Sequence, residues 1–135
     1  MNLKQFSRDI LILLATLAVA IGGYMAWDNH TYHDTSQAKV SLQQAAKAGD
    51  DTILIFHKTG CSDCRKVVTD VNRGIDKNAK SKIVVVDTKN SDLYKDYQVS
   101  EVPTFIRLHN GQEINRYSGT DTQQIATFLT ASAQK

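Results

Sequence analysis

The chain has 135 residues, of which 41% are hydrophobic, a composition typical of one globular domain with a short appendage. Its formal charge of +2 does not favour nucleic acid as a partner, because lysine and arginine are scattered rather than clustered. Both cysteines lie in one short motif, which excludes a scaffold of disulfides between distant segments.

The first predicted element is a single membrane-spanning helix at residues 10–27. This run of eighteen residues has no charge, and a helix of that length spans about 27 Å, close to the roughly 30 Å hydrocarbon core of a bilayer. Lys4 and Arg8 precede the run and Asp28 follows it. Since positive residues favour the cytoplasmic side, we expect residues 1–9 inside and the rest of the chain outside the cytoplasm.

A cleaved secretory signal is the alternative for this segment. Ala18-Val19-Ala20 resembles a small-residue cleavage site. The apolar run continues through Ile21-Gly22-Gly23, however, which favours the anchor. Both alternatives deliver the remainder of the chain to the same compartment. That remainder consists of a polar linker predicted at residues 28–38 and a folded domain predicted at residues 39–135.

Helices and strands alternate along this domain. Apolar runs predict strands at residues 52–56 and 83–86, and the segments 105–109 and 113–117 are predicted strands because they flank a hairpin signal. Helices are predicted from Ser36 to Gly49, from the cysteine motif to about Asn78, from Asp92 to Tyr97, and from Asp121 onward. This α/β order predicts a central mixed sheet with helices packed on both faces.

Capping and turn residues mark the ends of several elements. Ser36 is a predicted N-cap, and Gly49 is the predicted stop of the same helix. Asn110-Gly111 predicts a two-residue hairpin turn, because both positions of such a turn require positive φ. Asp121 with Gln124 predicts a capping box at the start of the last helix.

The two cysteines, in Cys61-Ser62-Asp63-Cys64, follow a predicted strand and begin a predicted helix. Backbone N–H groups at a helix N-terminus stabilise a thiolate over a thiol, and the thiolate is the form that attacks a disulfide. The spacing brings the second sulfur close enough to resolve a mixed disulfide. We therefore expect Cys61 to be the nucleophile and Cys64 the resolving thiol of a redox-active disulfide.

A zinc site is the main alternative for this motif. Tetrahedral zinc needs further ligands. The chain has no second Cys-x-x-Cys, and its four histidines are scattered at positions 30, 33, 57 and 109. The sequence therefore predicts no metal and no other cofactor.

Several features together carry a family resemblance. They are the apolar strand 53–56, the Cys-x-x-Cys motif, the tripeptide Val102-Pro103-Thr104, and the glycines Gly111 and Gly119 in and after the hairpin. With them, the stretch from about Val40 to Lys135 resembles thioredoxin. The resemblance implies a thioredoxin-like fold, thiol–disulfide oxidoreductase activity, and a cis peptide at Pro103 beside the cysteines. Similar anchored proteins occur in Gram-positive bacteria, including accessory proteins of bacteriocin systems.

The sequence also departs from the thioredoxin pattern. Ser62-Asp63 stands between the cysteines instead of Gly-Pro, and Gly60 replaces a tryptophan. Ile55 occupies a strand position where thioredoxins usually bury an acid that assists proton transfer at the second cysteine. The first strand of the fold is expected to be reduced or absent.

Three further residues are candidates for tuning the cysteines. The charge of Asp63 opposes a nearby thiolate, while Arg65 and Lys66 favour one, so the net effect stays open. His57, four residues before Cys61, either stabilises a thiolate or relays a proton, or is a structural residue at the loop edge. Thr104 follows Pro103 directly and is the third candidate.

The leading functional prediction is an oxidoreductase that acts on protein disulfides outside the membrane. Its expected partners are a secreted or surface protein with disulfides or thiols, and a membrane redox protein that recharges the cysteine pair. The alternative is a non-catalytic module that keeps the fold to hold a secreted client. A metal-handling role is the third interpretation.

Overall fold

The structure, a computed structural model, describes residues 2–78 and 80–131. Its described residues form two compact units, one ending at Thr31 and one beginning at Tyr32. The first unit is the helix α1, Leu3–Asn29, whose large apolar side chains are exposed. This helix is long and apolar enough to cross a membrane, and a signal sequence would meet the same criterion. It extends past the predicted span 10–27 at both ends. The extension at the N-terminal end includes Lys4 and Arg8, which are good helix formers despite their charge.

The second unit is built on a mixed sheet of four strands within the described residues. These strands are β1 (Asp51–His57), β2 (Lys82–Asp87), β3 (Thr104–His109) and β4 (Gln112–Ser118). Their order in the sheet is β2-β1-β3-β4. β1 pairs with β2 in parallel and with β3 in antiparallel, and β3 pairs with β4 in antiparallel. The predicted central mixed sheet is therefore confirmed.

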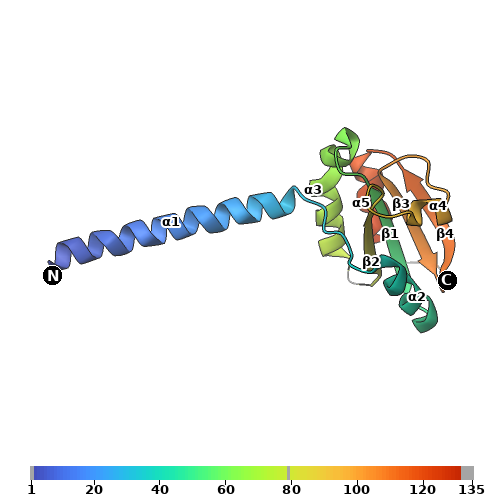
Figure 1. The fold of residues 1–135 in the computed structure, drawn as a ribbon, viewed down its shortest axis with the longest axis horizontal. Coiled ribbons are helices and arrows are strands. Elements are labelled where there is room, and N and C mark those ends of the chain that lie inside the picture. The colour runs from blue at the N-terminus through green and yellow to red at the C-terminus, as the bar shows by residue number, and fades with distance from the viewer. Residues whose placement is uncertain (1, 79, 132–135) are drawn as a thin grey trace. The chain divides into compact units, whose positions relative to one another are not determined.

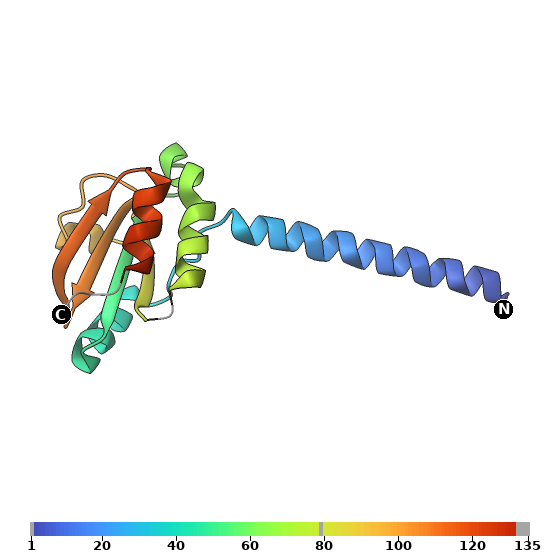
Figure 2. The same ribbon diagram turned by 180° about the vertical axis from the view of Figure 1, so that it is seen from behind.

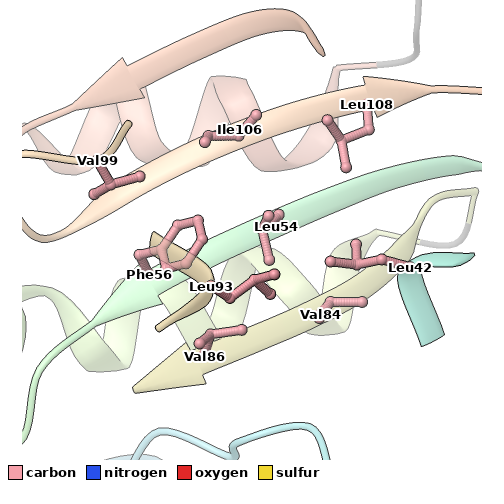
Figure 3. Close-up of a cluster of buried hydrophobic side chains, with 9 residues drawn as sticks. All are labelled: Leu42, Leu54, Phe56, Val84, Val86, Leu93, Val99, Ile106 and Leu108. Carbon is pink, nitrogen blue, oxygen red and sulfur yellow. The ribbon is translucent and has the colours of Figure 1, made fainter. Parts of the chain in front are cut away.

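Helices cover both faces of this sheet (Figures 1 and 2). They are α2 (Ala38–Ala48), α3 (Ser62–Lys77), α4 (Leu93–Asp96) and α5 (Thr122–Thr130). β1 is buried on both sides: Leu54 and Phe56 pack towards α2 and α4, while Ile53 and Ile55 pack towards α3 and α5. Figure 3 shows the first of these two clusters, in which Leu42 and Leu93 close over the sheet. A strand buried on both faces explains the continuous apolar run in the sequence.

The predicted ends of the elements are confirmed at three places. Gly49 ends α2 with φ of 75°. Asn110 and Gly111 have φ of 50° and 78° in the hairpin turn. The Asp121 carboxylate accepts the N–H groups of Gln123 and Gln124 and caps α5. The N–H of Asp121 donates to the Tyr117 hydroxyl at 3.1 Å, which takes the place expected of Gln124 in a capping box.

Ser36 does not cap α2, so this prediction is wrong. α2 begins at Ala38, and its N-cap residue is Gln37 in a left-handed conformation with φ of 55°. The cause lies just before it, at Thr35. The Thr35 N–H donates to the carbonyl of Val85 at 2.9 Å, and the Val85 N–H donates to Thr35 Oγ1 at 2.9 Å. Because Thr35 is fixed against β2, the chain turns into the helix at Gln37.

The predicted linker 28–38 is also wrong in part. We call residues 32–35 the strap, because Tyr32, Asp34 and Thr35 all bond to the domain. The domain therefore begins at Tyr32 rather than at residue 39. At the open edge of β2 the strap contributes only the one residue Thr35, which agrees with the expected reduction of the first strand.

Candidate active site

The two cysteines lie at the start of α3, as the sequence predicts. Cys61 is the N-cap residue of α3, and its Sγ accepts the N–H of Cys64 at 3.1 Å. Cys61 is partly accessible, whereas Cys64 is 1% exposed. The N–H of Cys61 donates to the carbonyl of Lys58 at 3.0 Å, which closes the preceding loop. The geometry therefore offers one reachable sulfur at the positive end of a helix and one sulfur buried behind it.

The buried thiol is held in its neutral form. Burial is the largest cause that raises the pKa of Cys64, and the side-chain hydrogen bond with Cys61 acts in the same direction. The carboxylate of Asp63 contributes a smaller effect of the same sign. Asp63 itself is exposed and forms an ion pair with Lys66 at 3.1 Å. Cys64 therefore cannot act as a nucleophile until a base removes its proton, or until Cys61 has reacted and no longer raises the pKa of Cys64.

The raised pKa of Cys64 predicts how the stability of the reduced chain changes in alkali. A thiol whose pKa is raised by folding stabilises the fold below the unfolded thiol's pKa of about 8.5, and this stabilisation is lost as the pH rises towards the folded value. We expect the reduced chain to lose stability above about pH 9. The oxidised chain has no thiols to titrate and should lose less, which thermal unfolding of both forms between about pH 7 and 10 will measure. Equal losses of stability in the two forms would contradict the prediction that the folded chain raises the pKa of Cys64.

The loop before β3 lies against Cys61. The Val102–Pro103 peptide bond is cis, and Cys61 Sγ is 3.9 Å from the carbonyl oxygen of Val102. Thr104 is buried, and its hydroxyl donates to the carbonyl of Glu101 at 2.6 Å while bonding Ser118 Oγ at 2.8 Å. The structure thus places the cis Val102–Pro103 peptide beside Cys61, and Thr104 links this loop to β4 through its bond with Ser118.

His57 lies inside the domain at the end of β1, with 5% of its surface exposed. Its Nε2 is 2.5 Å from Asp34 Oδ1, and its ring stacks on Tyr32 with centroids 4.2 Å apart and planes 16° apart. The Tyr32 hydroxyl in turn donates to the carbonyl of Cys64 at 2.7 Å. His57 is therefore connected to the active-site helix through the strap.

Asp87, which the sequence analysis did not single out, supports the loop before Cys61. Its carboxylate accepts the N–H groups of Thr59 and Lys89 and the Thr59 hydroxyl. Burial alone would raise the pKa of Asp87, but these hydrogen bonds outweigh it and hold the pKa below its ordinary value. Parallel pairing could have revealed this residue, because His57 and Asp87 are register partners at the carboxyl ends of β1 and β2.

Asp34, His57 and Asp87 lie close enough together to be considered as metal ligands. One ligand atom from each lies within 4.8 Å of the others. The contacts already described occupy these atoms, however: Asp34 bonds His57, and both oxygens of Asp87 receive donors from Thr59 or Lys89. These hydrogen bonds explain why the three residues lie together, and those of Asp87 support the loop before Cys61.

Comparison with known proteins identifies the fold and the family. The family model for thioredoxin matches residues 33–131. The chain belongs to the thioredoxin family. Mouse thioredoxin is 27% identical over 100 residues, covering 72% of this chain and 95% of its own length. The TPR repeat-containing thioredoxin TDX of Arabidopsis thaliana is 29% identical over 90 residues, covering 66% of this chain but only 24% of its own length.

Solved structures show the same fold at lower identity. Trxlp from Edwardsiella tarda has a TM-score of 0.62 and 22% identity, covering 73% of this chain and 97% of its own. Thioredoxin NaTrxh from Nicotiana alata has a TM-score of 0.62 and 21% identity, covering 70% of this chain and 83% of its own. The predicted thioredoxin-like fold is confirmed. Together with the Cys-x-x-Cys motif, membership of the thioredoxin family also supports the prediction that the chain is a thiol–disulfide oxidoreductase.

Proposed function

We propose that this thioredoxin-family chain is anchored by α1 and exchanges disulfides with proteins outside the cytoplasm. The observation that carries the chemistry is the reachable Cys61 sulfur, which accepts the Cys64 N–H while Cys64 stays buried behind it. The Val102 carbonyl of the cis Val102–Pro103 peptide lies beside the same sulfur, and a client would lie on this surface.

The proposed reaction has two exchange steps. The Cys61 thiolate attacks one sulfur of a client disulfide, forming a mixed disulfide and releasing a client thiolate that takes up a proton. Cys64 then gives up its proton and attacks the Cys61 sulfur, which forms the Cys61–Cys64 disulfide and releases the second client thiol. The client gains two electrons and the cysteine pair loses two. An oxidase runs the same steps in reverse.

The test is the reduction potential of the pair, measured on the full chain in detergent with glutathione buffers. A reduction potential of about −270 mV would indicate a reductase that needs a membrane electron donor. A reduction potential of about −120 mV would indicate an oxidant that needs a membrane electron acceptor. A cysteine pair that never forms a reversible disulfide would overturn the enzyme proposal. Catalytic cycling without any partner or added thiol would overturn the prediction of a membrane protein that recharges the pair.

The location is a separate part of the proposal. Lys4 and Arg8 at the start of α1 favour a cytoplasmic N-terminus, and no residue between them and Trp27 carries a positive charge. A reporter enzyme that folds only outside the cytoplasm, fused after Lys135, should be active and should remain with the membrane fraction. Activity in the medium instead would assign a cleaved signal. The bacteriocin-accessory type stays a prediction.

A non-catalytic binding module is the second candidate, and Ile55 favours it. This side chain is fully buried among apolar residues at the strand position where the family usually has an acid. A client that still binds, with an unchanged phenotype, after both cysteines are replaced by serine would support the binding module. Loss of the phenotype would support the enzyme.

A further inference from the structure

The strap, residues 32–35, reaches the redox site from the segment after α1, and it can be traced in Figure 1 between α1 and α2. Its Tyr32 contacts both Cys64 and His57, and its Asp34 contacts His57. Thr35 fixes the other end of the strap to Val85 in β2. The strap is therefore bonded at both ends, with the redox residues at one end.

Tyr32 acts on the residue that stabilises the Cys61 sulfur. The N–H of Cys64 donates to Cys61 Sγ at 3.1 Å, and the carbonyl of the same Cys64 accepts the Tyr32 hydroxyl at 2.7 Å. Burial raises the pKa of Tyr32 above its ordinary value, so the phenol stays protonated and remains a donor. Cys64 is thus held from both of its backbone polar groups, one towards Cys61 and one towards the strap.

Asp34 acts one step further away. Its carboxylate holds the Nε2 of His57, and the ring of His57 is the surface on which Tyr32 stacks. Among the described residues, two carboxylates lie close to this ring, Asp34 from the strap and Asp87 from β2. Asp87 in turn fixes Thr59 in the loop that leads to Cys61. His57 therefore contacts the strap and lies beside the carboxylate that fixes the loop before Cys61.

We propose that Tyr32 and Asp34 are positioning residues of the redox pair and that the strap sets its reduction potential. The inference rests on the proposed thiol–disulfide function. Fixing Cys64 keeps its N–H aimed at the Cys61 sulfur, which stabilises the reduced form of the pair. A looser Cys64 withdraws that stabilisation, so the pair becomes more reducing when the strap contacts are lost.

The experiment compares Tyr32→Phe with Tyr117→Phe in the full chain in detergent. Each variant loses one hydroxyl that forms a hydrogen bond, Tyr32 with Cys64 and Tyr117 with Asp121 at the start of α5. In glutathione buffers, Tyr32→Phe should favour the disulfide about fivefold more than the natural chain, which is ~20 mV at 29.6 mV per tenfold change. Tyr117→Phe should leave the equilibrium unchanged. Melting temperatures of both variants separate this effect from a loss of stability.

Asp34→Asn provides a second variant that keeps the size of the side chain. It should shift the equilibrium in the same direction. The effects of Tyr32→Phe and Asp34→Asn should not add, because Asp34 acts through His57 and Tyr32 on the same Cys64. Lower melting temperatures with an unchanged equilibrium in both variants would overturn the inference alone. A natural chain without a reversible disulfide would overturn the proposed function, and the inference with it.

Discussion

Replacing Cys64 by serine in the full chain is expected to trap covalent adducts with client proteins. In the proposed reaction the reachable Cys61 attacks the client disulfide, and this variant keeps it while it lacks the thiol that resolves the mixed disulfide. Turnover of a disulfide substrate should fall on the order of a thousandfold, because nucleophile and resolving thiol act as a unit. Non-reducing gel electrophoresis of membranes, followed by mass spectrometry of the adducts, measures the trapping and names the client.

Cys61→Ser is the matched control for this experiment. It removes the same chemical group from the same motif, but the remaining Cys64 is 1% exposed and cannot reach a client. We expect no adducts and an equally large loss of turnover. Adducts with Cys61→Ser rather than with Cys64→Ser would reverse the proposed roles of the two cysteines.

Placing a carboxylate at position 55 is expected to destabilise the domain severely. Ile55 is fully buried, and its cluster contains Val67, Val71 and Phe105. Ile55→Asp removes this packing and also buries a charge with no partner, which together should lower the free energy of unfolding by at least about 4 kcal/mol at neutral pH. Urea unfolding measures the loss, and Ile55→Val, expected to cost about 1 kcal/mol, gives the scale of packing alone.

Ile55→Asn separates the charge from the packing, because an amide of the same shape does not titrate. Burial raises the pKa of an introduced carboxyl above its unfolded value of about 3.9. The aspartate variant should therefore be most stable near about pH 4 and lose stability as the pH rises, while the asparagine variant shows no such trend beyond that of the natural chain. An aspartate variant as stable as the natural chain at neutral pH would show that position 55 is hydrated.

The sequence predicted the elements whose signals are local. The apolar run of β1, the hairpin turn at Asn110-Gly111 and the helix that begins after Cys61 all depend on neighbouring residues. The position of Cys61 at the helix start was predicted from local signals as well. A strand before the motif, a short loop and an apolar helical stripe after it indicate where the helix begins.

The contacts of the strap could not be predicted in the same way. Tyr32 and Asp34 lie in a polar segment without periodicity, and their partners Cys64 and His57 are 32 and 23 positions away in the chain. No spacing rule links such residues, since the contacts exist only after α3 and β1 have packed. Ser36 failed as a cap for the same reason, because the long-range bonds of Thr35 moved the helix start.

The strap has a practical consequence for producing the domain without α1. Among the described strands β2 is an edge strand that pairs with β1, and on its other side Thr35 bonds both the N–H and the carbonyl of Val85. A fragment that starts at Ser36 leaves these groups open on a β-branched strand, and such an edge is a template for pairing with another copy. Such a fragment should aggregate more readily than one that retains Tyr32, so the strap also protects the solubility of the domain.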